Sequence, residues 1–234
     1  MIQAKGIYAR IGSIEVLSQV DLHVARGEML AVIGANGAGK TSLLRTLSNI
    51  IIPEKGEIHF DGKPTRGKQA HELARMGLVH VPQGRQIIPN LSVRDNLLLG
   101  THYLNLPADE KSARLEKEFE RFPVLKAREG ISGGALSGGE QQMLAVSRGL
   151  MMGPKVLMLD EPSLGLAPKI VHLILQTLNE LKAEGLSVIL VEQAAVLALE
   201  YSDRGLVLRN GKVVVESDSV SLRNSQALVD GYLT

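Results

Sequence analysis

The stretch EMLAVIGANGAGKTSLLRTL, residues 28–47, decides the fold of this chain. It begins as a compact apolar strand, EMLAVI, continues as a glycine-rich loop and ends as a helix over residues 41–47. The loop matches the pattern G-x-x-x-x-G-K-[ST], which surrounds anionic oxygens with backbone N–H groups and a helix N-terminus. In such a loop Lys40 reaches the β- and γ-phosphates of a nucleotide, and the Thr41 hydroxyl ligates Mg²⁺. The stretch therefore predicts a phosphate-binding α/β core.

Apolar segments elsewhere in the chain are separated by helical ones, which is typical of a largely parallel sheet buried on both faces. Strands are expected at 155–160 and 186–192, and helices at 169–183 and 194–200. A hairpin about Asn210–Gly211 and a short helix reaching Thr234 are expected to end the chain.

Two further parts are added to this core. Short β-like runs at 3–8, 15–17 and 20–24, with a turn at Asp61–Gly62, predict an N-terminal antiparallel part, and a helix at about 69–75 leads into a strand that ends at Val81. Leu91–Met152 is mostly helical, with Leu115, Phe119 and Phe122 forming a narrow apolar stripe. We therefore divide the chain into a nucleotide-binding core, 1–90 and 153–234, and a helical subdomain, 91–152.

The composition excludes several classes of protein. The 234 residues are 44% hydrophobic but only 3% aromatic, so a sizeable and mainly aliphatic core is expected. A formal net charge of +1 gives no electrostatic case for nucleic acid as a partner. The absence of cysteine excludes disulfides, thiolate metal sites and a cysteine nucleophile. No apolar run approaches the ~20 residues that cross a bilayer, and the start lacks a signal peptide, so a soluble chain is expected.

A second motif, KVLMLDEP at 155–162, is a buried strand that ends in two carboxylates. Successive strand residues face opposite ways, but at the end of a strand the backbone turns and both side chains can project over the sheet edge. Asp160 is then placed to hold Mg²⁺, directly or through water, and Glu161 to accept a proton from an attacking water.

A third motif, LSGGEQQ at 136–142, begins a helix with two adjacent glycines. Ser137 and Glu140 match a capping box, so the simplest interpretation is an ordinary helix start. That interpretation leaves Gly138 and Gly139 unexplained, because glycine weakens a helix by roughly 1 kcal/mol against alanine. A second phosphate-binding helix N-terminus explains them, and one nucleotide needs two such ends only if they come from two subunits.

In this order the three motifs resemble those of the ATP-binding cassette family of ATPases, over almost the whole chain. The resemblance implies a P-loop NTPase core with a mostly parallel buried sheet, an N-terminal antiparallel β part and a helical insertion. It also implies a dimer that holds ATP, with Mg²⁺, between two subunits. One subunit contributes Gly34, Asn36, Gly37, Ala38, Gly39, Lys40, Thr41 and Ser42, and the other contributes Ser137, Gly138 and Gly139.

Other positions follow from the same resemblance. Gln83 in VPQGR resembles the family's glutamine loop, whose amide contacts Mg²⁺ and the water site. Three residues depart from the family pattern: Gln193 stands where a histidine usually contacts the γ-phosphate, Ala167 where an aspartate usually crosses the dimer, and Ile11 where an aromatic usually stacks on adenine. Gln193 can donate an amide hydrogen bond but carries no charge, so a slow but active site is expected. Ile11 and Val16 are expected to give adenine apolar contact only.

Taken together, the motifs resemble the cassette subunit of bacterial branched-chain amino-acid importers, with relatives that serve urea and short amides; Gln83 favours the urea and amide branch slightly. The resemblance implies a peripheral subunit on the cytoplasmic face of the inner membrane. Its expected partners are a second cassette, which is either an identical copy or, as the resemblance favours, a sibling, together with membrane permease subunits and, through them, an extracellular or periplasmic solute-binding protein. Ile87, Ile88, Pro89 and Leu91 are a candidate patch for docking the permease, or local packing.

Two other functions compete with this interpretation. The first is a soluble cassette ATPase that acts on nucleic acid or ribosomes, which the near-neutral charge and single cassette disfavour. The second is a P-loop kinase or small GTPase, in which LSGGEQQ has no role and for which no convincing guanine-reading motif is present.

Overall fold

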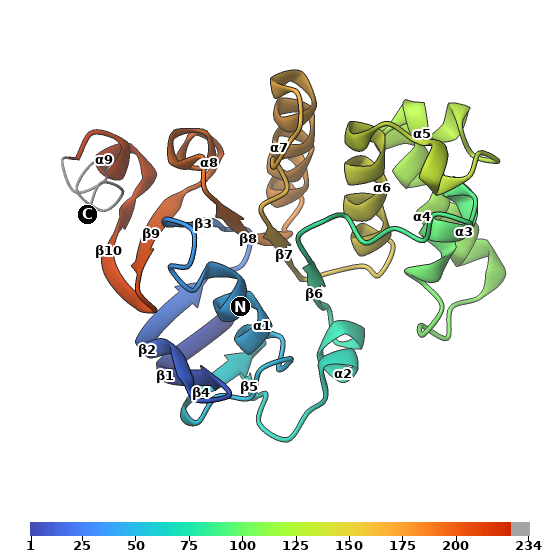
Figure 1. Cartoon of the computed structure of the whole chain (residues 1–234). Coiled ribbons are helices and arrows are strands. Elements are labelled where there is room, and N and C mark those ends of the chain that lie inside the picture. Colours follow the sequence, from blue (N-terminus) through green and yellow to red (C-terminus); the bar gives the residue numbers. More distant parts are fainter. Residues whose placement is uncertain (226–234) are drawn as a thin grey trace.

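A six-stranded sheet forms the centre of the molecule (Figure 1). In the computed structural model, which describes residues 1–225, its strands lie in the order β10-β9-β3-β8-β7-β6. They are β3 (Met29–Ile33), β6 (Leu78–Val81), β7 (Val156–Asp160), β8 (Ser187–Glu192), β9 (Arg204–Arg209) and β10 (Lys212–Asp218). Neighbouring strands are parallel except β9 and β10, which form an antiparallel hairpin. The predicted mostly parallel, buried sheet is therefore confirmed.

A second, antiparallel sheet lies beside it, in the order β2-β1-β4-β5. Its strands are β1 (Ile2–Ile11), β2 (Ile14–Val24), β4 (Lys55–Phe60) and β5 (Lys63–Pro64). The runs predicted at 15–17 and 20–24 are one strand, β2, and not two. Gln19 has a φ of 53° and the register with β1 shifts nearby, so an irregularity within the strand explains the break in the sequence pattern.

Helices cover the central sheet and form the insertion at the right of Figure 1. Those of the core are α1 (Lys40–Leu47), α2 (Ala70–Arg75), α7 (Pro168–Ala183), α8 (Ala195–Tyr201) and α9 (Ser219–Arg223). Those of the insertion are α3 (Val93–Leu99), α4 (Ala108–Arg121), α5 (Pro123–Ala127) and α6 (Gly138–Leu150), with a short 3₁₀ turn at Gly133–Ala135. Within residues 1–225 the last helix, α9, ends at Arg223, and the part of the prediction that reaches Thr234 lies outside the described residues. Within 1–225, no helix combines the length and the apolar character that crossing a bilayer demands.

The two faces of the central sheet are buried in two different hydrophobic clusters. Along β3, Met29, Ala31 and Ile33 belong to the cluster that includes residues of α6, α7 and α8. Leu30 and Val32 belong to the cluster that includes residues of α1 and of the antiparallel sheet. Because successive strand residues face opposite ways, a strand covered on both sides is apolar throughout, which explains the run MLAVI.

The helical insertion shares the first of these clusters. Leu115, Phe119 and Phe122 are buried there, as the predicted apolar stripe requires. Helix α6 lies so close to the sheet that a Cβ on Gly149 would be 2.7 Å from Cγ2 of Val81. The insertion is therefore packed against the core through α6.

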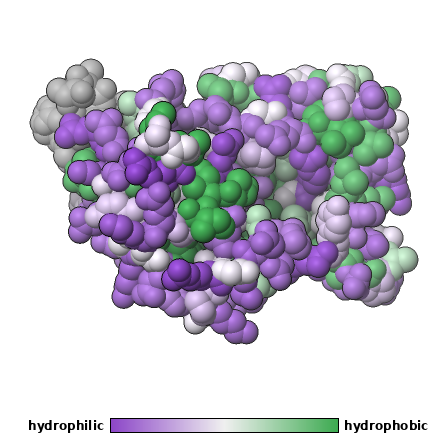
Figure 2. Space-filling model, turned by 60° about the horizontal axis from the view of Figure 1, so that its bottom comes forward, coloured by the Kyte–Doolittle hydropathy of each residue, from purple (hydrophilic) through white to green (hydrophobic). Residues whose placement is uncertain are grey.

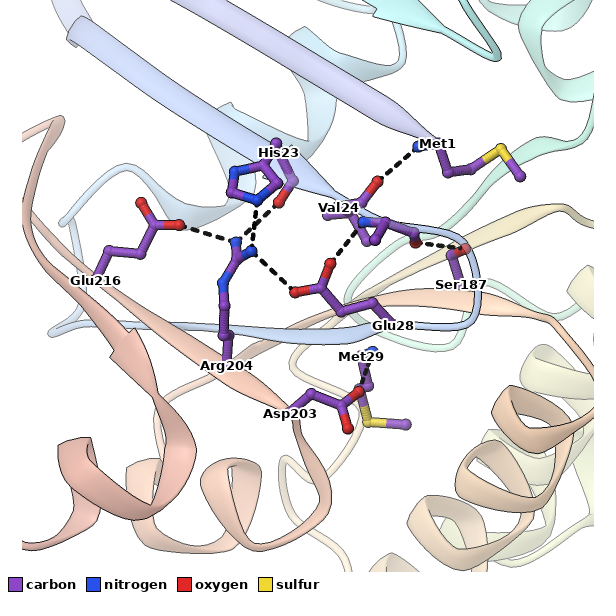
Figure 3. Close-up of polar contacts among 10 residues, drawn as sticks. Met1, His23, Val24, Glu28, Met29, Ser187, Asp203, Arg204 and Glu216 are labelled. Atoms are coloured by element: carbon purple, nitrogen blue, oxygen red, sulfur yellow. Dashed lines mark hydrogen bonds and ion pairs between the residues drawn. The ribbon is translucent and has the colours of Figure 1, made fainter.

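Arg204, at the start of β9, joins the two sheets (Figure 3). Its guanidinium donates to Nε2 of His23 at 2.7 Å and to the His23 carbonyl at 2.9 Å, both on β2. The same group pairs with Glu28 at 3.1 Å and with Glu216 of β10 at 2.8 Å. This network fixes the antiparallel sheet beside the central one, next to the start of β3, where Leu30 is paired with Arg204.

The surface carries exposed apolar side chains in limited regions. On the face drawn in Figure 2, hydrophobic side chains gather over the helical insertion and in one patch near the centre, whereas most of the rest is polar. Most of this face is thus polar, and its apolar regions are candidates for contact with other proteins.

Candidate functional site

An open cavity of about 540 Å³ lies at the carboxyl ends of β3, β6 and β7, where ligands bind in open α/β sheets. Its lining contains most of the residues that the sequence predicted for phosphate binding. The lining residues are Ile14, Glu15, Val16, Asn36, Gly37, Ala38, Gly39, Lys40, Thr41, Ser42, Gln83, Glu161, Asn210 and Gly211.

The glycine-rich loop is held between β2 and the β9–β10 hairpin. A Cβ on Gly34 would lie 2.3 Å from the Leu208 carbonyl oxygen, and one on Gly39, whose φ is 105°, would lie 2.9 Å from the Val16 carbonyl oxygen. The Gly211 N–H donates to the Ala38 carbonyl at 2.8 Å. Gly34 lies behind the loop and does not line the cavity, but only glycine fits there. The loop is thus preformed, with its N–H groups available to an anion.

Lys40 is buried and folded back over this loop. Its Nζ donates to the Gly34 carbonyl at 2.8 Å and to the Ala35 carbonyl at 3.2 Å, and it lies 3.1 Å from Oε1 of Glu161. A buried ammonium needs such partners. A phosphate entering the loop offers the same charge compensation, so Lys40 can exchange Glu161 for a phosphate oxygen.

Asp160 and Thr41 form an oxygen-rich pair beside the cavity, which Thr41 lines and Asp160 does not. The Thr41 hydroxyl donates to Oδ1 of Asp160 at 3.1 Å, and burial raises the pKa of the Asp160 carboxyl. Within residues 1–225 no group of three or more His, Cys, Asp or Glu side chains is arranged to hold a metal. One carboxylate and one hydroxyl beside a phosphate site nevertheless fit Mg²⁺, which typically binds one or two carboxylates, substrate phosphates and water.

Glu161 turns away from the line of β7 into the cavity. Its φ of 47° is in the left-handed region, which costs of order 1 kcal/mol for a residue with a side chain. Oε2 of Glu161 accepts a hydrogen bond from Nε2 of Gln83 at 2.9 Å, while Oε1 faces Lys40. The strained backbone therefore brings Lys40, Gln83 and Glu161 together, from three different parts of the sequence.

Of the two residues expected to contact adenine, one lines the cavity. Val16 lines the cavity, but Ile11 does not, and its side chain is 49% exposed. Ile14, which pairs with Ile11 across the β1–β2 hairpin, lines the cavity instead. The exact turn of that hairpin decides which isoleucine faces the cavity, and the sequence does not specify it. Asn210 also lines the cavity, although its hairpin turn was recognised without a functional role.

Two other predicted groups lie outside the cavity. Gln193 follows β8 and is exposed, and Ser137, Gly138 and Gly139 begin α6. Ser137 and Glu140 form the predicted capping box: Oγ of Ser137 accepts from the Glu140 N–H at 3.4 Å, and the Glu140 carboxylate from the Ser137 N–H at 2.7 Å. A single chain thus does not bring this helix end to its own cavity.

Sequence reasoning missed Glu192, which ends β8 as Asp160 ends β7. Its buried carboxylate accepts from the Ser163 N–H at 2.9 Å and from the Ser163 hydroxyl at 2.7 Å, and burial raises its pKa. Glu192 thereby fixes the start of the loop that runs from Ser163 to Ala167. An acidic residue at the end of an apolar strand was the signal that could have identified it.

Comparison with known proteins places these features in a family. The ABC transporter family model matches residues 17–164. The branched-chain amino acid transport ATP-binding protein BraG of Pseudomonas aeruginosa is 41% identical over 95% of this chain and 94% of its own length. The probable branched-chain amino acid transport ATP-binding protein LivG of Archaeoglobus fulgidus is 31% identical over 100% of this chain and 95% of its own length.

Solved structures agree with the sequence relatives. The ADP conformation of the cassette MJ1267 superimposes with a TM-score of 0.85 at 26% identity, covering 98% of this chain and 97% of that one. A dimeric post-hydrolysis state of the cassette MJ0796, bound to ADP and Pi, superimposes with a TM-score of 0.82 at 25% identity over 94% of this chain and 99% of that one. The chain therefore belongs to the ABC transporter family, in which it is an ATP-binding, ATP-hydrolysing cassette subunit.

Proposed function

We propose that this cassette powers the uptake of branched-chain amino acids, and that it hydrolyses ATP in a site shared between two cassettes. The separation of Ser137, Gly138 and Gly139 from the cavity of their own chain carries the second part of this proposal. A capped helix start with bare glycine N–H groups suits an anion, and a second subunit can bring such a helix start to the cavity. The dimeric form of the related cassette MJ0796 supports the same arrangement.

In this proposal the glycine-rich loop and Lys40 hold the phosphates, and Thr41, Asp160 and Gln83 lie where Mg²⁺ would be held. Mg²⁺ would neutralise charge on the β- and γ-phosphates. Val16 and Ile14 give the adenine ring apolar contact. In the chain as described, Glu161 is paired with Lys40 and bonded to Gln83. ATP must draw Lys40 toward its phosphates before Glu161 becomes available as a base.

Glu161 then accepts a proton from water as the water oxygen bonds to the γ-phosphorus and the bond to the β–γ bridging oxygen breaks, which gives ADP and phosphate. The Gln83 amide orients the water and the carboxylate. Gln193, at the end of β8, donates an amide hydrogen bond to the γ-phosphate in place of the usual histidine. Because no positive charge develops there, turnover is expected to be slow.

The solute is proposed from the relatives. BraG and LivG are named for branched-chain amino acid transport. Relatives near 30% identity include a fructose import protein of Rhizobium meliloti and a glutamate transport protein of Corynebacterium glutamicum, so identity at that level does not select a solute. The 41% relative therefore favours amino acids over the urea and amide branch that Gln83 suggested.

A groove between the end of β6 and helices α3 and α6 is proposed as the docking site for a helix of the membrane permease. Leu99 and Tyr103 in its lining are 38% and 67% exposed, and Arg148 of α6 also lines it. Ile88 of the predicted patch is 43% exposed, whereas Ile87 packs partly against the core. This docking region spans the end of β6 and the insertion. It would hold the cassette at the cytoplasmic face of the membrane.

The shared site is tested with Glu161→Gln, measured by sedimentation with and without MgATP. We expect this variant to bind ATP, to form a dimer that the wild type forms only transiently, and to lose hydrolysis by about 10²–10⁴-fold. A Glu161→Gln chain that stays monomeric in saturating MgATP would contradict a shared site. Rapid turnover by the same variant would remove Glu161 as the base.

The solute is tested by co-purifying the cassette with its permease from membranes. Leucine, isoleucine or valine, supplied with the solute-binding protein, is expected to raise the ATPase rate. Stimulation by urea or acetamide and not by these amino acids would assign the chain to the urea and amide branch.

A further inference from the structure

Residues 83–86, which we name the glutamine loop, are attached at both ends to parts of the proposed reaction machinery. At one end Nε2 of Gln83 donates to the Glu161 carboxylate at 2.9 Å. At the other end Nη1 of Arg85 donates to Oε1 of Gln141 on α6 at 3.2 Å, and the Gln86 carbonyl accepts from Arg148, also on α6, at 2.7 Å. Two residues of sequence thus separate the contact to the base from the contact to α6.

The backbone of this loop is strained. Gly84, Arg85 and Gln86 have φ values of 83°, 65° and 44°, so three consecutive residues are left-handed. For the two that carry side chains this conformation costs roughly 1–2 kcal/mol each. Such a conformation persists only when contacts on both sides hold it. Loss of either contact would allow the loop to relax, so the two ends are expected to influence each other.

Arg85 lies directly on the first turn of α6. A Cβ on Gly138 would be 2.9 Å from Nη2 and 3.0 Å from Nη1 of Arg85, so a side chain there would displace the guanidinium. A cation beside a helix N-terminus is unfavourable in the helix dipole. No carboxylate within residues 1–225 is paired with Arg85 to offset this cost. Neither helix stability nor an ion pair therefore accounts for its position.

We propose that Arg85 is a positioning residue for the ATPase reaction: it holds the Ser137–Gly139 turn against the glutamine loop. A change in the contacts of Gln83 and Glu161, which belong to one nucleotide site, is thereby passed to Ser137, Gly138 and Gly139. These three residues are the half-site that the same chain offers to a second cassette. Arg85 does not line the cavity of its own chain. The inference rests on the shared site of the proposed function and adds a residue through which the two sites of a dimer are coupled.

The first test compares Glu161→Gln with the double variant Glu161→Gln/Arg85→Ala. Binding of a fluorescent ATP analogue to the monomer should be unchanged, because the glycine-rich loop is intact. ATP-dependent dimerisation should weaken by about tenfold, the effect of losing a hydrogen bond from a charged group. Arg94→Ala is the matched control, since the ion pair of this exposed arginine on α3 is with Glu129 and not with α6 or the loop.

The outcomes separate the two proposals. If Glu161→Gln itself does not dimerise, the shared site fails. If it dimerises and Arg85→Ala leaves that dimer as tight as before, the positioning role of Arg85 is refuted while the shared site stands. If Arg85→Ala lowers the melting temperature markedly, Gln141→Ala is used in its place, because it removes the hydrogen-bond acceptor of Arg85 on α6. This variant should weaken ATP-dependent dimerisation in the same direction but by less.

A mixing experiment tests whether Arg85 acts on the other subunit's site. Arg85→Ala and Glu161→Gln chains are each expected to be poor ATPases, although both should still bind ATP. A mixed dimer contains one site built from the intact Glu161 of the first chain and the intact half-site of the second, so mixing should restore turnover. If mixing restores nothing, Arg85 acts within its own cavity and the proposed coupling is wrong.

Discussion

Glu118 on α4 offers a direct test of the packing that supports the helical insertion. Its side chain is 2% exposed, one carboxylate oxygen is bonded to Arg121, and the other has no hydrogen-bond partner within residues 1–225. The buried Ser147 hydroxyl of α6 has no such partner either. Burial raises the pKa of Glu118 from 4.5 to about 7, against the opposing effect of Arg121. The Glu118→Gln variant keeps the shape of the side chain and removes its titration.

The sign of the effect follows from proton binding. Between pH 4.5 and about 7 the folded chain holds the Glu118 proton more tightly than the unfolded chain does, so the stability of the wild type falls as the pH rises through this window. At 1.36 kcal/mol per pH unit the whole window amounts to about 3 kcal/mol, of which roughly 2 kcal/mol falls between pH 5.5 and 8. The stability of Glu118→Gln relative to the wild type should therefore increase by roughly 2 kcal/mol over that range.

Urea unfolding, followed by circular dichroism at several pH values, measures this difference. Glu116→Gln is the control, because this carboxylate lies on the same helix but is 56% exposed, and its surface pair with Lys126 contributes less than about 1 kcal/mol. If the stability difference between Glu118→Gln and the wild type stays constant within about 0.5 kcal/mol from pH 5.5 to 8, the Glu118 carboxyl is not held in a low-dielectric site and the reasoning fails.

Three further predictions test other parts of the structure. Lys40→Ala should weaken ATP binding by roughly 10- to 100-fold in an equilibrium binding assay, because a charge-assisted contact to phosphate is lost; unchanged affinity would show that the backbone alone holds the phosphates. Gln193→Ala should slow steady-state turnover clearly, and an unaltered rate would mean that its amide does not replace the usual histidine. Gly100→Ala should destabilise the chain by about 1–3 kcal/mol in urea, because the added Cβ would lie 2.4 Å from the Arg148 carbonyl oxygen, whereas Gly130→Ala, with open space around it, should be nearly neutral; equal stability of the two would contradict the close packing of α3 on α6.

The fold was predictable because its signals are local and agree with one another. A strand, a glycine-rich loop and a helix follow each other within residues 28–47, and the structure places them as β3, the loop and α1. The apolar runs that became β7 and β8 carry no alternation because both faces of the sheet are covered. The interruption at Gln19 shows the limit of this reasoning, because a single left-handed residue divided one strand into two apparent ones.

The parts of the site that sequence reasoning missed depend on relations between distant segments. Ile14 faces the cavity because of the register of one hairpin. Glu192 acts on Ser163, which is 29 residues earlier in the chain. Arg85 reaches a helix that begins more than fifty residues later. In each case the residue type is ordinary and only its partner gives it a role.

The two glycines at 138 and 139 are subject to two separate requirements, and the structure shows one of them. Each Cα faces a side chain of the same chain: Gly138 faces Arg85, and Gly139 faces Ile170, whose nearest carbon would lie 3.1 Å from an added Cβ. Without any nucleotide, a side chain at either position would therefore require Arg85 or Ile170 to move. The N–H groups of a first helical turn, by contrast, have no acceptor within the helix and remain available to an anion. Gly138 therefore packs against Arg85 of the glutamine loop and Gly139 against Ile170 of α7, while their N–H groups serve the second requirement. A substitution that disturbs Arg85 should consequently impair the half-site even though Ser137, Gly138 and Gly139 are unchanged.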